Sequence, residues 1–274
     1  MSVGEVLVRL RSSAMVDRLE AFRSSPSTAG VFADFDGTLS EIAHLPHDAR
    51  PLEGAVDLLN ALGQRFALMA IVSGRSAVQL VDWLGPSVEI WGTHGAEFAH
   101  GGSISLTEQA KRYEELMMKV REEAEELLDA LDLDGVLIED KRVMLGLHFR
   151  AAKDVEHARA ELDQIAQTLA DRHGLLRAGG RLAFELRPPE EFSKAAVVLQ
   201  RARELDLKAA LFIGDDRVDL AGFDALDVLA DEGVVTLRVA VDSDEVPPEL
   251  IERADMVVGN PRAAVDFLQS LLTD

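Results

Sequence analysis

Six short apolar runs constrain the fold more than any other feature of the sequence. Three lie in the first third of the chain and three in the last, at residues 30–35, 66–73, 88–94, 209–215, 234–241 and 255–259. Val, Ile, Leu and Phe follow one another in them with little alternation, and stretches with helical spacing lie between them. Strands that are apolar on both faces are typical of parallel sheets covered by helices on both sides. We therefore expect an α/β fold with a doubly wound, Rossmann-like sheet.

The middle of the chain has a different pattern. Residues 108–131 and 153–173 have the spacing of amphipathic helices, and a pair of short strands follows each of them. The first pair turns near residues 140–142 and the second at Gly179-Gly180, a dipeptide favoured in tight hairpin turns. We expect an inserted α/β unit at residues 105–187, within a core formed by residues 30–104 and 188–274. Residues 1–29 form a separate N-terminal helical segment in this interpretation.

Charge and composition limit the partners of the chain. The net charge of −21, from 28 basic and 49 acidic side chains, disfavours nucleic acid and anionic membranes as ligands. No apolar run approaches the length of about 18 residues that a membrane-spanning helix requires, and the N-terminus lacks the continuous apolar stretch of a signal peptide. The absence of cysteine excludes disulfides and thiolate chemistry. We expect a cytoplasmic protein, and an anionic ligand would need a local cation.

Two carboxylates stand two positions apart at the end of the first apolar run. Asp34 lies within that run, where an unpaired carboxylate is expensive to bury, and Asp36 lies two positions later. Residues two apart on a strand point to the same side. In open α/β sheets, ligands bind at the carboxyl ends of the strands. Local turn chemistry is the alternative explanation, and it accounts better for Asp36 and Gly37 than for Asp34.

Further polar residues stand where other predicted strands end. Ser73 and Gly74 follow the second apolar run, although a serine in this position is often only the N-cap of the next helix. Lys194 begins a helical stretch, which is unexpected because helix N-termini disfavour cations. The apolar run at residues 209–215 ends in three carboxylates, Asp215, Asp216 and Asp219.

These residue types fit phosphoryl transfer. The carboxylates of Asp34, Asp36 and Asp215 are hard oxygen ligands without a competing soft ligand, which suits Mg²⁺. Ser73 and Lys194 offer a hydroxyl and a cation that can hold phosphoryl oxygens. Positioning and charge neutralisation are what a phosphoryl transfer site must supply.

In this order, "DFDGTL" (34–39), "VSGR" (72–75), the lysine of "SKAA" (193–196) and "IGDDRVD" (213–219) resemble the four motifs of the haloacid dehalogenase superfamily of phosphatases. Within it, "GTHGAE" (92–97), "IEDKRVMLGLHFR" (138–150), "FELRP" (184–188) and "GDDRVDLAGFDAL" (214–226) are similar to stretches of trehalose-6-phosphate phosphatases. The similarity extends over residues 31–268. It implies a haloacid dehalogenase core with an inserted α/β cap.

The resemblance also implies roles in the core. Asp34 would be the nucleophile, and Asp36 would protonate the departing sugar oxygen and then activate water. Asp34, Asp215 and the backbone carbonyl of Asp36 would bind Mg²⁺. Ser73, Gly74 and Lys194 would bind the phosphoryl group. Two acids, Asp216 and Asp219, would support the metal site or Lys194.

The implied substrate is trehalose 6-phosphate, cleaved to trehalose and phosphate. The main rivals are another glycosyl phosphate, such as glucosylglycerol phosphate, and a role as a non-catalytic sugar-phosphate sensor. A trehalose-phosphate synthase of the same pathway is the implied protein partner. Without the resemblance, the cap residues would be read as the exposed positions of a two-faced sheet, and His94 as structural. The residues implied to bind the substrate are Arg75, His94, Glu139, Lys141, His148, Arg150, Glu185 and Arg187.

Two other classes of enzyme fit the sequence less well. A nicotinamide-binding enzyme needs a glycine-rich fingerprint directly after the first strand, and "ADFDGTLS" is not one. A zinc hydrolase could use His44 and His47, but two histidines three positions apart without a third ligand are weak evidence.

Overall fold

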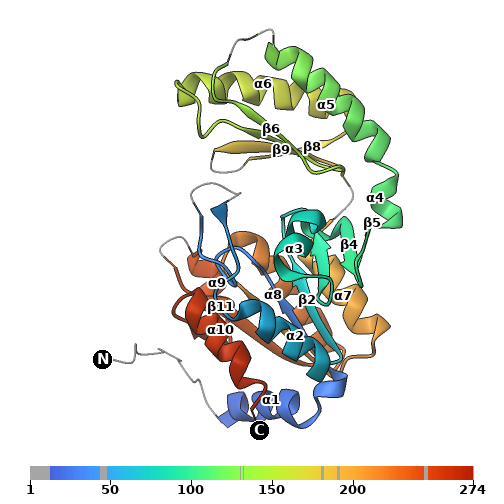
Figure 1. Cartoon of the computed structure of the whole chain (residues 1–274), viewed down its shortest axis with the longest axis vertical. Helices are drawn as coiled ribbons and strands as arrows, with labels where there is room; N and C mark the ends of the chain where they lie inside the picture. The colour runs from blue at the N-terminus through green and yellow to red at the C-terminus, as the bar shows by residue number, and fades with distance from the viewer. Residues whose placement is uncertain are drawn as a thin grey trace. The chain divides into compact units, whose positions relative to one another are not determined.

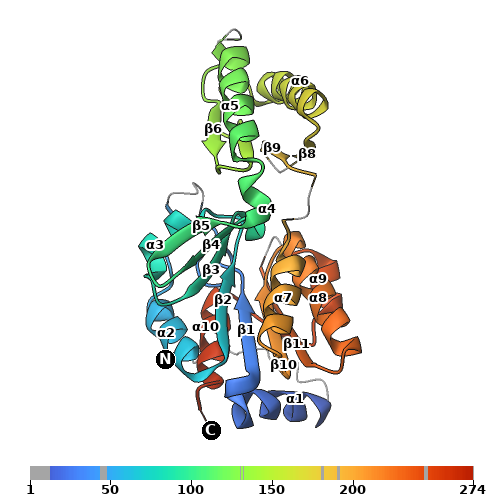
Figure 2. The same cartoon turned by 90° about the vertical axis from the view of Figure 1, so that its right-hand side faces the viewer.

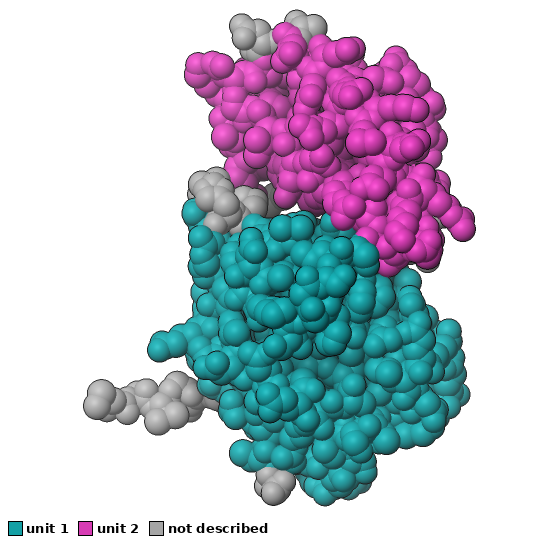
Figure 3. Space-filling view, turned by 45° about the vertical axis from the view of Figure 1, so that its right-hand side comes forward, with its two compact units in different colours: residues 1–105, 192–274 teal, residues 106–191 magenta. Residues whose placement is uncertain are grey.

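A computed structural model of the chain describes residues 13–43, 48–129, 131, 133–179, 182–189, 192–243 and 246–273. It divides into two compact units (Figure 3). Unit 1 comprises Met1–Ser105 and Phe192–Asp274, and unit 2 comprises Leu106–Glu191. Within the described residues, no helix combines the length and the apolar character needed to cross a membrane. The histidines of the zinc alternative, His44 and His47, lie outside the described residues.

Unit 1 is built on one sheet with the strand order β12-β11-β10-β1-β2-β3-β4-β5 (Figures 1 and 2). The strands from β12 to β3 are parallel to one another, and β4 is antiparallel to β3. This topology confirms the predicted doubly wound α/β fold, and each of the six apolar runs overlaps one parallel strand. The strands are β1 (Ala29–Ala33), β2 (Leu68–Val72), β3 (Glu89–Gly92), β4 (Glu97–His100), β5 (Ser103–Leu106), β10 (Ala209–Gly214), β11 (Val235–Val241) and β12 (Met256–Val258).

Helices cover both faces of this sheet because both faces of its central strands are apolar. Val31 and Ala33 of β1 pack into one core cluster and Phe32 into the other, and all three are fully buried. Burying one such Val or Phe side chain contributes about 1.5–3 kcal/mol. The first cluster contains residues of α1 (Ser13–Ser24), α2 (Ala55–Arg65), α3 (Ala77–Leu84) and α10 (Pro261–Ser270), and the second contains residues of α7 (Lys194–Glu204), α8 (Leu220–Asp231) and α9 (Pro248–Arg253).

Unit 2 has its own antiparallel sheet and its own core. The strand order is β6-β7-β9-β8, formed by β6 (Leu137–Asp140), β7 (Leu145–His148), β9 (Ala183–Arg187) and β8 (Leu176–Gly179). Leu147 and Leu186 are fully buried in a cluster with residues of α5 (Glu114–Asp129) and α6 (Val155–His173). Asp154 caps the start of α6 and Gly174 ends it in a left-handed conformation.

One predicted helix of unit 2 is broken in the structure. The helix predicted at residues 108–131 is divided into α4 (Glu108–Lys111) and α5, because the backbone N–H of Tyr113 donates to the carbonyl oxygen of Ala110, only three residues earlier. No proline or glycine marks this break in the sequence. Both predicted hairpins are present, although Gly180 of the second turn lies outside the described residues.

Candidate active site

The two carboxylates after β1 lie in a turn that brings the chain against β10. The N–H of Asp34 donates to the carbonyl oxygen of Ile213 at 2.9 Å, and the Thr38 hydroxyl lies 3.3 Å from Asp215 Oδ1. Gly37 has a φ of 69°, and a Cβ at this position would lie 2.0 Å from Asp215 Oδ2. Position 37 therefore accepts only glycine. The "DGT" turn places the ends of β1 and β10 in direct contact.

Lys194, the first residue of α7, lies between two buried carboxylates. Its Nζ is 2.7 Å from Asp34 Oδ1 and 2.6 Å from Asp219 Oδ1, and the residue is 2% exposed. Asp219 is fully buried, and its Oδ2 accepts hydrogen bonds from the N–H groups of Asp215 and Asp216, each at 3.0 Å. These carboxylates offset the unfavourable position of a lysine at a helix start. Asp219 in turn fixes Lys194 against Asp34.

The environment shifts the protonation of these groups. Burial raises the pKa of Asp34 to about 7, although the positive charge of Lys194 opposes the rise. Burial raises the pKa of Asp215 to about 8, and the charges of Asp34 and Asp219 add to the effect. Burial alone would lower the pKa of Lys194, but Asp219 and Asp34 outweigh it and raise that pKa, so the ammonium group persists. Three carboxylates around one ammonium group favour an additional cation.

Asp36 forms a two-point ion pair with Arg75. The Arg75 Nε lies 2.7 Å from Asp36 Oδ2, and its Nη2 lies 2.6 Å from Oδ1. The guanidinium carbon also lies 4.9 Å from the centre of the Trp83 ring and 5.9 Å from that of Phe35. Such forked pairs fix the orientation of a carboxylate. Sequence reasoning assigned Arg75 only to the substrate and missed this contact.

Ser73 follows β2 but is not the cap of the next helix. The N-cap of α3 is Ser76, whose side chain accepts a hydrogen bond from the N–H of Gln79. Ser73 is 1% exposed, and its Oγ accepts a hydrogen bond from the N–H of Arg75 at 3.3 Å. The alternative explanation of Ser73 as a helix cap is therefore wrong.

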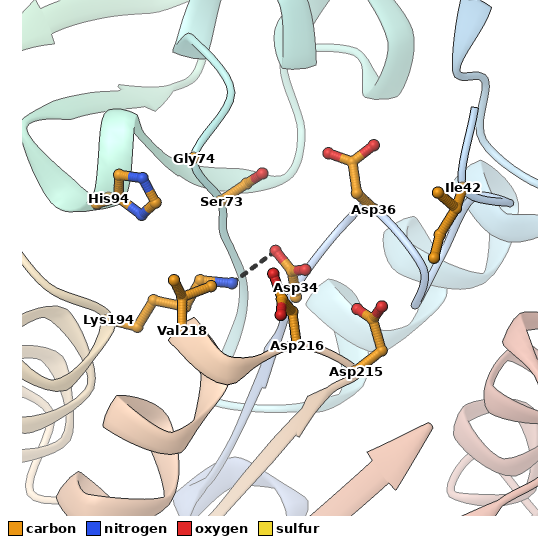
Figure 4. Close-up of a pocket in the computed structure, with 10 residues that line it drawn as sticks. All are labelled: Asp34, Asp36, Ile42, Ser73, Gly74, His94, Lys194, Asp215, Asp216 and Val218. Carbon is orange, nitrogen blue, oxygen red and sulfur yellow. Dashed lines mark ion pairs between the residues drawn. The ribbon is translucent and has the colours of Figure 1, made fainter. Parts of the chain in front are cut away.

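Most of the residues described above line a cavity of about 340 Å³ (Figure 4). In the close-up, the amine of Lys194 points to Asp34, and the ring of His94 stands beside Gly74. Two predicted residues, Arg75 and Asp219, do not line the cavity and instead contact Asp36 and Lys194, which do. The lining residues are Asp34, Asp36, Ser73, Gly74, His94, Lys194, Asp215 and Asp216, together with two that sequence reasoning did not identify, Ile42 and Val218.

The acidic cluster of this cavity fits a divalent cation. Carboxylate oxygens of Asp34, Asp215 and Asp219 lie within 4.8 Å of one another and all three residues are buried. Oxygen ligands of this kind suit Mg²⁺. Both oxygens of Asp219 already accept hydrogen bonds, from Lys194 and from backbone N–H groups. Asp34 and Asp215 are therefore better suited to bind the cation, and Asp219 to orient its neighbours.

A second charged cluster lies on the sheet of unit 2. Lys141 Nζ is 3.0 Å from Glu185 Oε1 and 3.6 Å from Glu139 Oε2, and His148 Nε2 lies 2.9 Å from that same Glu139 oxygen. The strand register explains the grouping, since Glu139 and Glu185 both pair with Gly146, on either side of it. The structure thus brings together four of the six predicted cap residues.

The other two predicted cap residues differ from this group. Arg150 is exposed and follows β7, and no ion pair joins it to the cluster within the described part of unit 2. Arg187 lies two residues after Glu185 on β9 and therefore points to the same side of that strand.

The hydrogen bond from His148 lowers the pKa of Glu139 to about 2 despite its burial. Burial lowers the pKa of Lys141, but Glu185 and Glu139 outweigh this and raise it.

The doubly wound sheet with its inserted α/β unit is a fold of the haloacid dehalogenase type. The structure is similar to that of a haloacid dehalogenase-like hydrolase from Bacteroides thetaiotaomicron, with a TM-score of 0.60 and 13% identity over 89% of this chain and 99% of that one. It is also similar to the C-terminal domain of a trehalose-6-phosphate phosphatase from C. albicans, with a TM-score of 0.73 and 21% identity over 95% of this chain and 97% of that one. At these identities the similarity establishes the fold.

The family follows from the sequence comparison. The model of the trehalose-phosphatase family matches residues 32–249, so the chain belongs to this family, as the sequence resemblance predicts. The trehalose-phosphate phosphatase of Mycobacterium avium is 32% identical over 88% of this chain and 61% of its own length. That of Mycobacterium marinum is 34% identical over 72% of this chain and 51% of its own length. The chain thus matches only about half to three fifths of the length of these relatives.

Proposed function

We propose that the chain is a Mg²⁺-dependent phosphatase that hydrolyses trehalose 6-phosphate to trehalose and phosphate through a phosphorylated Asp34. The observation that carries the proposal is the buried Asp34, which contacts Lys194 and shares one cavity with Asp36 and Ser73. Membership of the trehalose-phosphatase family supports the choice of substrate.

In the first step, a carboxylate oxygen of Asp34 attacks the phosphorus atom and the bond from phosphorus to the sugar oxygen breaks. Lys194 holds Asp34 Oδ1 at 2.7 Å and so fixes the carboxylate for attack. Asp36 gives a proton to the departing sugar oxygen, and the trehalose product leaves. Arg75 engages both oxygens of Asp36 and so orients this acid; one of the two contacts opens when Asp36 carries the proton that it donates, and the ion pair re-forms once that proton has left.

In the second step, water attacks the phosphorus atom of the acyl phosphate and Asp36 accepts a proton from that water. The bond from phosphorus to the Asp34 oxygen breaks, which regenerates the carboxylate and releases phosphate. Splitting the hydrolysis in this way replaces one difficult displacement by two easier ones. The Ser73 hydroxyl, the N–H of Gly74 and the Lys194 ammonium group bind the phosphoryl oxygens in both steps.

We propose Asp34, Asp215 and the backbone carbonyl of Asp36 as the ligands of Mg²⁺. When bound there, the cation would neutralise negative charge on the phosphoryl group. Asp216 and Asp219 orient these ligands and Lys194, which the hydrogen bonds of Asp219 support.

We propose that the polar groups of unit 2 recognise the sugar. The cluster of Glu139, Lys141, His148 and Glu185 combines charged donors and acceptors that suit sugar hydroxyls, since charged groups form the strongest hydrogen bonds. Arg150, Arg187 and, from unit 1, Arg75 and His94 complete the proposed set. Sites built to pair with hydroxyl groups strongly reject ligands that lack them.

A phosphate-release screen of the purified chain tests this proposal. With Mg²⁺, trehalose 6-phosphate should give the highest kcat/KM among sugar phosphates that include glucose 6-phosphate and glucosylglycerol phosphate. A different best substrate would refute the substrate assignment but not the assignment of phosphatase activity. Failure to hydrolyse any phosphate ester, together with tight binding of sugar phosphates, would favour the sensor instead. Both catalytic acids argue against that role because a binding protein needs neither.

We further propose that the chain acts in the cytoplasm, on substrate supplied by a trehalose-phosphate synthase, and that nucleic acid is not a ligand. The net charge of −21 supports the last point. Cell fractionation and a coupled assay with the synthase test these statements. Detection of the chain in a membrane or secreted fraction, or no trehalose from the coupled reaction, would contradict them.

A further inference from the structure

The loop between β3 and β4 has a strained backbone beside the cavity. Thr93 and His94 have φ angles of 49° and 57°, both in the left-handed region that side chains other than glycine disfavour. The conformation is least favourable for a β-branched residue such as Thr93. Strained residues of this kind persist only when the surrounding structure holds them in place.

A fully buried carboxylate supplies that restraint. Oε2 of Glu97, the first residue of β4, accepts a hydrogen bond from the Thr93 hydroxyl at 3.1 Å and another from the N–H of Ala77 at 2.6 Å. Ala77 is the first residue of α3, immediately after the segment that carries Ser73 and Gly74. One carboxylate oxygen therefore connects the strained loop to the start of α3.

Backbone contacts bring the same two segments together at the cavity. The N–H of His94 donates to the carbonyl oxygen of Ser73 at 2.9 Å, and the N–H of Thr93 donates to that of Arg75 at 2.8 Å. The His94 ring packs so closely on Gly74 that a Cβ there would lie 2.9 Å from its Cε1 (Figure 4). The backbone conformation at Thr93 and His94 thus determines where the imidazole lies.

We infer that Glu97 is a positioning residue, which holds Thr93 and His94 in the left-handed conformation and so keeps the imidazole against Gly74 in the cavity. The inference rests on the proposed function, in which His94 belongs to the residues that recognise the sugar. None of the catalytic or metal-binding roles proposed above uses Glu97. A buried carboxylate is costly unless hydrogen bonds offset its burial, and Oε2 of Glu97 accepts two of them, one from the loop and one from α3.

Two variants weaken the restraint in different ways. Glu97→Gln keeps the shape but replaces a charged acceptor by a weaker neutral one. Thr93→Val removes the hydroxyl and keeps the β-branched shape. Each should raise KM for trehalose 6-phosphate about tenfold and leave kcat within about threefold, the signature of lost substrate binding. Unchanged KM values in both variants would overturn the inference.

A third variant separates positioning from a purely structural role. Thr93→Asn places a residue that tolerates the left-handed conformation at this position. It should keep KM within about threefold of wild type and restore most of the loss when added to Glu97→Gln. If Glu97 only stabilises the start of α3, Asn at position 93 will rescue nothing, and the inference fails.

The dependence on His94 is tested by a double-mutant cycle. His94→Ala should raise KM about tenfold, and adding Glu97→Gln to it should change KM no further, because the group being positioned is already gone. Additive effects, or a normal KM in His94→Ala, would contradict the inference. The wild-type rate on trehalose 6-phosphate in the same assay tests the proposed function separately.

A measurement without substrate completes the test. The ring proton resonances of His94, assigned by their loss in His94→Ala, should shift in Glu97→Gln and Thr93→Val and remain near their wild-type positions in Thr93→Asn. Unshifted resonances in the first two variants would overturn the inference even if the chain hydrolysed no phosphate ester.

Discussion

The two charged clusters of the chain use the same residue types under different constraints. In unit 1, Lys194 and Asp34 are 2% and 6% exposed and lie at the ends of separate elements that packing fixes. In unit 2, the Lys141 and Glu139 side chains are 16% and 38% exposed, and they contact neighbours across the face of a small sheet. The first arrangement permits little adjustment of its groups and the second permits more. We expect substitutions to abolish chemistry in the first cluster and to change selectivity in the second.

The largest expected effect comes from replacing the proposed nucleophile. Asp34→Asn should lower kcat by about 10⁴-fold or more, since an amide does not attack phosphorus, and Asp36→Asn should lower it by about 10²–10⁴-fold. Steady-state phosphate release measures both effects. Asp57→Asn, at an exposed position of α2, serves as the matched control and should be active. If Asp34→Asn retains a tenth of the wild-type rate, the mechanism is wrong.

Removal of the proposed metal ion should produce the next largest loss of activity. Chelation with EDTA should lower the rate by about 10²-fold or more, and added Mg²⁺ should restore it, because the cation stabilises transition-state charge by several kcal/mol. Mg²⁺ should also raise the melting temperature of the wild type but not that of Asp215→Asn, which lacks one proposed ligand. Full activity in excess EDTA would exclude a metal from the reaction.

Substitutions in unit 2 should affect activity on trehalose 6-phosphate more than activity on a small aryl phosphate. Glu185→Ala removes an acceptor and leaves Lys141 without its 3.0 Å partner, so kcat/KM for trehalose 6-phosphate should fall by about 10- to 100-fold. Hydrolysis of a small aryl phosphate should stay within about threefold, since it requires only the groups of unit 1. Glu156→Ala, at an exposed position of α6, is the control. Equal losses of activity on both substrates would contradict the assignment of chemistry to the cluster of unit 1 and of selectivity to that of unit 2.

The smallest expected effect is on stability. The pKa of Glu139 in the folded chain is about 2, below its ordinary value of 4.5, so ionised Glu139 stabilises the fold above pH 4.5. This contribution is lost as the pH falls toward 2. Because the side chain is 38% exposed, it should amount to only about 0.2–1 kcal/mol. In urea unfolding, Glu139→Gln should have a lower free energy of unfolding than the wild type at pH 7, and this difference should disappear near pH 2. A difference that persists near pH 2 would show that the loss comes from packing and not from the charge of Glu139.

The sequence predicts the core site better than the cap, for physical reasons. Asp34 is identifiable because a carboxylate inside an apolar run is costly to bury without a partner. Lys194 is identifiable because a cation at the start of a helix needs an oppositely charged partner. Glu139 and Glu185, in contrast, have the alternation of any sheet with one exposed face, and only the resemblance to a family singles them out. The pairing of Asp36 with Arg75 and the restraint by Glu97 depend on side-chain geometry that no local pattern encodes.

The insertion of unit 2 into unit 1 has a consequence for folding. The central strand β1 pairs with β10 through partners such as Ala29 and Ala209, so residues 106–191 are synthesised before the central sheet can form. Unit 2 has its own core and largely local pairing, which favours rapid folding, whereas the contact between β1 and β10 closes a very long loop. We expect the cap to become protected on the ribosome first. The buried ion pair of Asp34 and Lys194 then forms only after most of the chain has been made.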